Sequence, residues 1–195
     1  PEGNLPEISF VGKKMLAPIW ISSMTGGTKE AATINKNLAK VCGQYGLGMG
    51  LGSCRIILES DEYLKDFQLR KYANDAPLYA NLGIAQLEEI FDAEKSYLIT
   101  DLINKTETDG LIIHVNPLQE WLQPEGDIFK RSPLSTIKQA TDLGVKIIVK
   151  EVGQGFGPAS LKELMKLPVS AIDFGAHGGT NFSKLEMHRA HEIRQ

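Results

Sequence analysis

The chain has 195 residues, of which 42% are hydrophobic, 23% charged and 7% aromatic. This composition is typical of a globular protein that buries a core, and it excludes a disordered, coiled-coil or collagen-like chain. The 21 Lys and Arg residues nearly balance the 24 Asp and Glu residues, and all of them are scattered along the sequence. We therefore expect neither a nucleic-acid partner nor binding to an anionic membrane.

Two cysteines, Cys42 and Cys54, give no support to a disulfide framework. The sequence shows no signal peptide and no apolar run long enough to cross a bilayer. We therefore expect a cytoplasmic protein whose thiols are reduced.

Two apolar arms at the start of the chain predict a hairpin over residues 4–17, with its turn at Gly12 and Lys13. Short apolar runs between glycine, proline or polar residues then predict six β-strands, at residues 18–24, 46–53, 77–83, 110–116, 146–153 and 171–178. None alternates simply between polar and apolar residues, as expected of parallel strands that are buried on both faces. Helical patterns separate or follow these strands at residues 30–41, 134–140 and 184–195.

Polar residues gather near the carboxyl end of every predicted strand, which is where α/β folds bind their ligands. A doubly wound sheet usually has GxGxxG after its first strand, whereas the turn here reads Met24-Thr-Gly-Gly-Thr28. We therefore favour a (β/α)8 barrel. The strand starts lie 25 to 36 residues apart, and a complete barrel needs about 250 residues. Residues 1–195 are thus expected to form a single incomplete barrel domain with about six of its eight β/α units.

The segment from His114 to Asp127 is the densest in groups that carry chemistry. Glu120 is either a ligand of Mg²⁺, sharing the ion with water and a substrate phosphate, or part of a solvated acidic loop. His114 is either a hydrogen-bonded core histidine or a catalytic group at a strand end. Arg55 is either a phosphate ligand or an exposed surface arginine. We interpret Cys54, which has no obvious base beside it, as a lining residue rather than a nucleophile.

Lys150 lies within the apolar run of residues 147–152, where an unpaired ammonium would be costly. Three interpretations remain open: an ion pair with Glu151 or another acid, a Schiff-base lysine as in barrel aldolases, or a contact with the electron-rich edge of a flavin ring.

Two glycine-rich segments also remain ambiguous. The alternating glycines of residues 46–52 leave one face of a strand bare, which suits either a flat ligand or closely packed neighbours. The cluster at residues 175–182 either receives a phosphate on its backbone N–H groups or forms a tight loop.

Seven short motifs occur in the order found in the type 2, flavin-dependent isopentenyl-diphosphate isomerases, a family that this sequence resembles from about Leu16 to Glu186. The motifs are Ser22-Ser-Met-Thr-Gly-Gly27, Gly52-Ser-Cys-Arg55, Ala80-Asn-Leu-Gly83, His114-Val-Asn-Pro-Leu-Gln-Glu120, Pro124-Glu-Gly-Asp127, Val149-Lys-Glu-Val-Gly153 and Gly178-Gly-Thr-Asn-Phe182. The resemblance implies a (β/α)8 barrel that binds FMN, requires Mg²⁺ and a reductant such as NADPH, and interconverts isopentenyl and dimethylallyl diphosphate. It further implies a homo-oligomer of four or eight subunits.

The resemblance also assigns roles residue by residue. The flavin contacts of the family match Ser23, Met24, Thr25, Ser53, Asn81, Lys150 and Thr180. Its substrate contacts match Ser53, Arg55, His114, Asn116 and Gln119, and its metal ligand matches Glu120. Reduced FMN would act as acid and base in the family's reaction, with no net redox change. The catalytic residues would be Gln119, His114 and Lys150. Gln119 would act in orientation or as a proton relay, and Lys150 would stabilise negative charge on the reduced flavin.

Some family features have no counterpart in this sequence: an Arg-Lys element that holds the substrate diphosphate, and glycine-rich loops after strands seven and eight that hold the FMN phosphate. In addition, Cys54 stands where many relatives carry glutamine, and His177 replaces a residue that is commonly glycine. Three rival functions remain: another FMN-dependent barrel oxidoreductase, a Schiff-base aldolase that uses Lys150, and an incomplete barrel that binds or assembles without catalysis.

Overall fold

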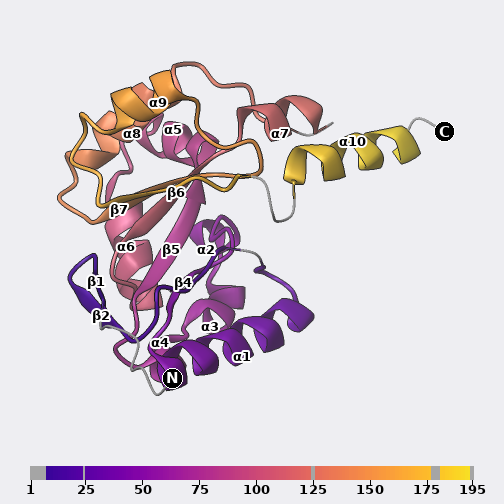
Figure 1. The fold of residues 1–195 in the computed structure, drawn as a ribbon. Coiled ribbons are helices and arrows are strands. Elements are labelled where there is room, and N and C mark those ends of the chain that lie inside the picture. Colours follow the sequence, from indigo (N-terminus) through magenta and orange to yellow (C-terminus); the bar gives the residue numbers. More distant parts are fainter. Residues whose placement is uncertain (1–7, 24, 124–125, 177–180, 194–195) are drawn as a thin grey trace, which may run out of the picture. The chain divides into compact units, whose positions relative to one another are not determined.

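The structure is a computed structural model that describes residues 8–23, 25–123, 126–176 and 181–193, without the side chains of residues 190–193. The chain divides into two compact units. The first comprises Pro1–Leu82 and Ser96–Ile112, and the second comprises Gly83–Lys95 and Ile113–Gln195. Figure 1 labels the elements of both units.

The first unit opens with a hairpin of β1 (Ile8–Phe10) and β2 (Lys13–Met15). The predicted position of its turn is wrong by one residue: the turn lies at Val11 and Gly12, because Lys13 already pairs with Phe10. Both turn residues have positive φ, as two-residue hairpin turns require. The further elements are β3 (Trp20–Ile21), α1 (Lys29–Tyr45), β4 (Gly48–Gly50), α2 (Ile56–Glu59), the 3-10 helix η1 (Asp61–Tyr63), α3 (Leu64–Phe67), α4 (Arg70–Ala73), β5 (Leu78–Gly83) and α6 (Tyr97–Thr106).

Helix α1 shows how the local sequence sets the ends of an element. Thr28 accepts a hydrogen bond from the Ala31 backbone N–H at the start of the helix, and Gly46 ends it in the left-handed conformation, with φ of 60°. Both are favoured cap residues because they satisfy the unpaired backbone groups of a helix end. Residues four apart, such as Ala31, Asn35 and Ala39, form its buried face.

The second unit begins at the last residue of β5 and contains most of the elements that follow. These are α5 (Ile84–Asp92), the later part of β6 (Leu111–Val115), α7 (Pro117–Leu122), α8 (Pro133–Thr141), β7 (Ile147–Glu151), α9 (Pro158–Leu164), β8 (Ala171–Asp173) and α10 (Phe182–Ile193). Strand β6 begins in the first unit and ends in the second.

Strands pair in the order in which they occur along the chain. The order is β3-β4-β5-β6 in the first unit and β6-β7-β8 in the second. The pairs β3–β4, β4–β5 and β7–β8 are parallel. This is the connectivity of a (β/α)8 barrel with six of its eight strands, whereas the strand order of a doubly wound sheet reverses direction. The predicted fold class is therefore confirmed.

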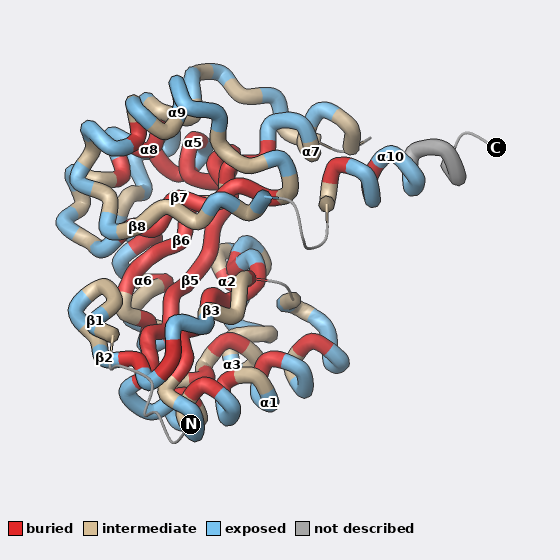
Figure 2. The backbone as a smooth tube through the Cα atoms, viewed as in Figure 1, coloured by how far each residue is buried: buried red, intermediate tan, exposed pale blue. Residues whose placement is uncertain are grey.

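The core lies along the central strands of each unit. All residues of β5 and β7 are buried, as Figure 2 shows in red, whereas β3 and β8 are half-buried along their lengths. The strands are shorter than predicted because the polar residues at their carboxyl ends, such as Ser22 and Ser23, belong to loops. Of the predicted strand ends, residue 24 and residues 177–178 lie outside the described part of the chain.

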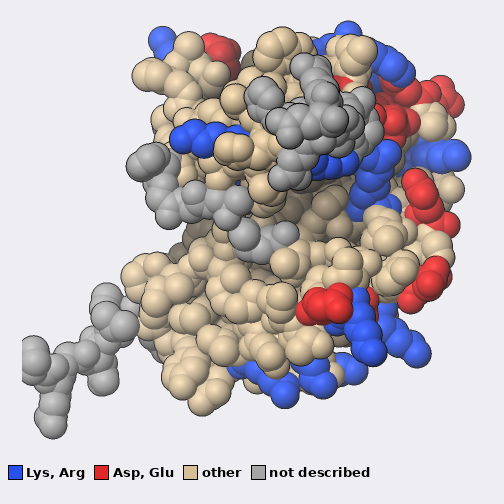
Figure 3. Space-filling view, turned by 90° about the vertical axis from the view of Figure 1, so that its right-hand side faces the viewer, with Lys and Arg blue, Asp and Glu red and all other residues tan. Residues whose placement is uncertain are grey.

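Acidic and basic side chains lie beside one another on the face that Figure 3 presents. In the described part of the chain, no helix combines the length and the apolar character needed to cross a membrane.

Neighbouring protein atoms fill the space beside the alternating glycines of residues 46–52. A Cβ added to Gly48 would lie 2.2 Å from the Trp20 ring, and one added to Gly52 would lie 2.0 Å from the Thr25 carbonyl oxygen. Real Cβ atoms do not come so close to other heavy atoms. The structure therefore favours the packing interpretation of these glycines over a flat ligand.

We expect Gly52→Ala to lower the free energy of unfolding by about 1–3 kcal/mol, because the added methyl would displace backbone. Gly157→Ala is the matched control, since a Cβ there meets nothing within 4 Å and its φ is −69°. Urea unfolding monitored by circular dichroism compares the two variants with wild type. Equal midpoints for both variants would contradict the packing interpretation.

Candidate active site

Three predicted residues of the first unit lie at neighbouring strand ends: Ser23 after β3, Ser53 after β4 and Asn81 within β5. The hydroxyl of Ser23 is buried and has no hydrogen-bond partner. The Asn81 amide donates to the carbonyl oxygen of Leu51 at 3.1 Å. Because buried polar groups are almost always paired, the unpaired hydroxyl of Ser23 marks a position that suits a polar ligand atom.

Thr25 is fixed by a buried residue that sequence reasoning missed. Its hydroxyl donates to Asn35 Oδ1 at 2.7 Å, and Asn35 Nδ2 donates to the Thr25 carbonyl oxygen at 3.2 Å. Helix α1 thus holds the turn that precedes it. The sequence feature that could have indicated Asn35 is its position as a lone amide on the otherwise apolar face formed by Ala31 and Ala39.

Ser53 and Arg55, both predicted to bind substrate, lie together at one cavity of the first unit. It has a volume of about 370 Å³ and is lined by Gly26, Gly27, Ser53, Arg55, Ile56 and Glu59. A guanidinium and a hydroxyl beside a Gly-Gly turn are donors that suit a phosphate group.

Three predicted residues of the second unit form one hydrogen-bonded network at the carboxyl end of β6. Asn116 Nδ2 donates to Glu120 Oε1 at 2.7 Å and to Gln119 Oε1 at 3.3 Å. The other carboxylate oxygen, Glu120 Oε2, accepts the backbone N–H of Asp127 at 2.9 Å. The spacing of three and four residues at the start of α7 brings these side chains together. Asn116 Oδ1 is buried without a partner and is a further position for a ligand donor or cation.

Lys150 is buried on β7, directly opposite Asp173 in the register of β7 and β8. Its ammonium donates to the backbone carbonyl oxygen of Glu151 at 2.8 Å. Burial lowers the pKa of Lys150, and the negative charges of Asp173 and Glu151 oppose this effect. The carboxylates of Asp173 and Glu151 thus act on Lys150 through their electric fields, whereas Lys150 donates its hydrogen bond to the backbone carbonyl oxygen of Glu151.

The carboxylate of Glu151, which we predicted only as a possible partner of Lys150, organises the loop after β7. Its Oε2 atom accepts three successive backbone N–H groups, from Gly153 at 2.6 Å, Gln154 at 2.6 Å and Gly155 at 2.9 Å. Three N–H groups that converge in this way form an anion-binding nest. The chain occupies this nest with its own carboxylate.

His114 lies on β6, close to the end of the strand. Desolvation lowers the pKa of His114 to about 4, and the positive charge of Lys150 adds to the effect. The imidazole is therefore neutral near pH 7. It does not act as a cationic acid at that pH.

A second residue that sequence reasoning missed, Gln86, lies beside His114. A Cβ at Gly83 would meet Gln86 Oε1 at 2.2 Å and His114 Nε2 at 2.8 Å, so both side chains pack over the bare face of this glycine. Gln86 Nε2 also donates to Asp127 Oδ2 at 3.3 Å. The sequence indicated Gln86 only weakly, because we did not predict the helix α5 on which it lies.

One cavity of the second unit lies apart from the predicted residues. It measures about 590 Å³ and is mostly apolar, lying among α7, α8, α9 and the loop after β7, with Leu118, Ile137, Phe156 and Leu164 in its lining. None of the predicted site residues lines it.

Cys54 is buried, and desolvation raises its pKa to about 12, so its thiol is protonated at neutral pH. This argues against a nucleophilic role for Cys54. Among the described residues, no cluster of three or more His, Cys, Asp or Glu side chains is placed to hold a metal ion. A Mg²⁺ ion that shares one carboxylate with a phosphate and water does not need such a cluster.

Several predicted positions lie outside the described residues. They are Met24, Pro124, Glu125, His177 and the motif residues up to Thr180. The predicted FMN contacts Met24 and Thr180 therefore stay predictions, as does the proposed phosphate-binding role of the glycine-rich turn.

We expect the free energy of unfolding to fall between about pH 6.5 and pH 4 because of His114. An unfolded histidine binds a proton below about pH 6.5, whereas the folded imidazole stays neutral down to about pH 4. Between about pH 7 and pH 4.5, wild type should lose about 2 kcal/mol more stability than His114→Gln. Urea unfolding of both proteins at the two pH values measures this difference. An equal loss would show that His114 titrates normally.

Comparison with known proteins finds strong sequence similarity to several proteins that share one name. The chain is 44% identical over 188 residues to an isopentenyl-diphosphate delta-isomerase of Nostoc sp. (strain PCC 7120), covering 96% of this chain and 53% of that protein. It is 42% identical to the protein of the same name from Rickettsia typhi, covering 100% of this chain and 58% of that one. The chain thus spans little more than half the length of these relatives. No family model matches it.

A solved structure supports the fold. The old yellow enzyme homologue of Zymomonas mobilis matches with a TM-score of 0.56 and 13% sequence identity, covering 87% of this chain and 72% of that one. At this identity the likeness concerns the fold alone, and it agrees with the six-strand barrel connectivity described above.

Proposed function

We propose that this chain carries six of the eight β/α units of an isopentenyl-diphosphate isomerase, which interconverts isopentenyl and dimethylallyl diphosphate. The observation that carries the proposal is the 44% identity to a protein of that name along 96% of the chain. The network of Asn116, Gln119 and Glu120 supports it, since it joins in one place three residues to which the sequence motifs assigned substrate or metal.

We further propose that the isomerase is of the flavin-dependent type. The unpaired buried hydroxyl of Ser23 in the first unit and the buried ammonium of Lys150 in the second are groups that suit polar atoms of FMN. Ser53, Thr25 and Asn81 would contribute further contacts, together with Met24 and Thr180. Reduced FMN would supply the acid and base that move a proton onto and off the alkene, so NADPH would be needed only for the initial reduction.

The chain's own residues would bind and orient the substrate. Arg55 and Ser53 offer donors to a diphosphate, and Lys150 would offer positive charge to the reduced flavin in a place shielded from water. The neutral imidazole of His114 and the amide of Gln119 can orient a substrate or relay a proton without adding charge. Glu120 would hold Mg²⁺ through one carboxylate oxygen, and the diphosphate would share the ion.

The isomerase proposal can be tested on the full-length protein under anaerobic conditions with FMN, NADPH, Mg²⁺ and isopentenyl diphosphate. We expect many molecules of dimethylallyl diphosphate per molecule of NADPH consumed, because the reaction has no net redox change. NMR quantifies the product, and absorbance at 340 nm follows the NADPH. Consumption of one NADPH per turnover would instead indicate an oxidoreductase, and product formation without flavin would refute the flavin-dependent type.

We expect Glu120→Gln to raise the Mg²⁺ concentration for half-maximal activity by at least tenfold, because a neutral amide is a poor ligand for this ion. The matched control is Glu163→Gln, which removes an exposed carboxylate that pairs with Lys166. A magnesium titration of the isomerase rate compares both variants with wild type. An unchanged magnesium requirement in Glu120→Gln would remove Glu120 from the metal site.

A further inference from the structure

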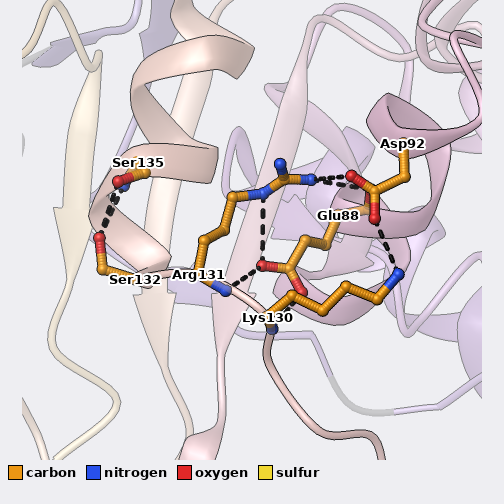
Figure 4. Close-up of polar contacts among 6 residues, drawn as sticks. All are labelled: Glu88, Asp92, Lys130, Arg131, Ser132 and Ser135. Carbon is orange, nitrogen blue, oxygen red and sulfur yellow. Dashed lines mark hydrogen bonds and ion pairs between the residues drawn. The ribbon is translucent and has the colours of Figure 1, made fainter.

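The loop between α7 and α8 is anchored to α5 by a buried carboxylate. Glu88 Oε2 accepts the backbone N–H of Lys130 at 2.9 Å, and Oε1 accepts that of Arg131 at 3.0 Å (Figure 4). The Glu88 side chain is only 7% exposed, and Arg131 Nε lies 3.4 Å from its Oε1 atom. The carboxylate thus holds the main chain of the loop, whatever side chains the loop carries.

Asp92, one helical turn further along α5, forms an outer and more exposed layer of the same contact. It pairs with the Lys130 ammonium at 2.8 Å and with the Arg131 guanidinium (Figure 4). Exposed ion pairs of this kind contribute little to stability. Asp92 therefore offers a matched control for Glu88. It lies on the same helix and contacts the side chains of the same two residues, but the described backbone N–H groups of Lys130 and Arg131 donate to Glu88 and not to Asp92.

The other end of this loop contacts the carboxylate of Glu120 on α7. Asp127 donates its backbone N–H to Glu120 Oε2 at 2.9 Å, and its own carboxylate accepts from Gln86 Nε2 on α5 at 3.3 Å. Only two residues separate Asp127 from Lys130. The position of the Asp127 N–H is therefore set by a short segment of main chain that α5 holds on both sides.

We propose that Glu88 is a positioning residue for the Glu120 carboxylate and acts through the backbone of residues 127–131. The inference rests on the proposed function, in which Glu120 holds Mg²⁺. One oxygen of Glu120 is oriented by Asn116 and the other by Asp127, and only the latter contact depends on the loop. Groups that orient a metal ligand from behind commonly change metal affinity by about 10- to 100-fold when they are lost.

The test uses Glu88→Gln and Asp92→Asn in the full-length protein, with Mg²⁺ and inorganic pyrophosphate as the probe. The readout is the Mg²⁺ concentration at the midpoint of the rise in melting temperature. We expect this midpoint to increase about tenfold in Glu88→Gln and less than twofold in Asp92→Asn. Amide hydrogen exchange should also accelerate at residues 127–131 in Glu88→Gln only. If Glu88→Gln does not accumulate, Glu88→Asp, which keeps the charge on a shorter side chain, should show a smaller increase.

A double-mutant cycle separates positioning from general destabilisation. In a Glu120→Gln background, adding Glu88→Gln should leave the Mg²⁺ midpoint unchanged, because the carboxylate that Glu88 positions is already absent. If Glu88→Gln lowers the melting temperature but not the Mg²⁺ response, or if the two effects add, the proposal is wrong. If wild type itself shows no Mg²⁺-dependent shift, the proposed metal site fails, and this inference fails with it.

Discussion

Backbone N–H groups in loops lack the partners that a sheet or helix would supply, and the second unit satisfies several of them with carboxylates. Glu151 accepts three such groups after β7, Glu88 accepts two before α8, and Glu120 accepts one from Asp127. Asp173 does the same for Gly175 after β8. A charged acceptor roughly doubles the strength of such a bond. Acidic residues thus anchor loops next to the candidate site residues of the second unit, whereas composition alone describes such residues as surface charge.

The fold could be predicted from the sequence where its signal is local. The run that became β5 is apolar at almost every position and β7 begins with three apolar residues, because both faces of these strands are buried, and their limits were predicted within two residues. Helix α5 was not predicted, although its sequence is amphipathic, and two of its polar residues, Gln86 and Glu88, are buried. The hairpin turn was misplaced by one residue, because Gly12 can occupy either central position and only the pairing of Phe10 with Lys13 decides.

The candidate site was predictable to the extent that its residues are close in sequence. Asn116 and Glu120 meet because they lie four residues apart at the start of one helix. Gln86 and Glu88 meet the loop before α8 only through the tertiary arrangement, about 40 residues away along the chain, so no motif spacing indicates them. The glycines of β4 show the converse limit, since the same bare strand face suits a ligand or a neighbouring ring, and only the position of Trp20 distinguishes them.

The electrostatics of the second unit bear on which groups can move protons. Lys150 is buried, yet the fields of Asp173 and Glu151 counteract the desolvation that lowers the pKa of Lys150. A positive charge on Lys150 in turn helps to keep His114 neutral, with a pKa of about 4. His114 is therefore neutral near pH 7, and a neutral imidazole has no acidic proton of the strength needed to protonate an alkene. An acid stronger than this imidazole must act in the proposed isomerisation, which is the part that reduced FMN would take, while His114 and Gln119 orient the substrate.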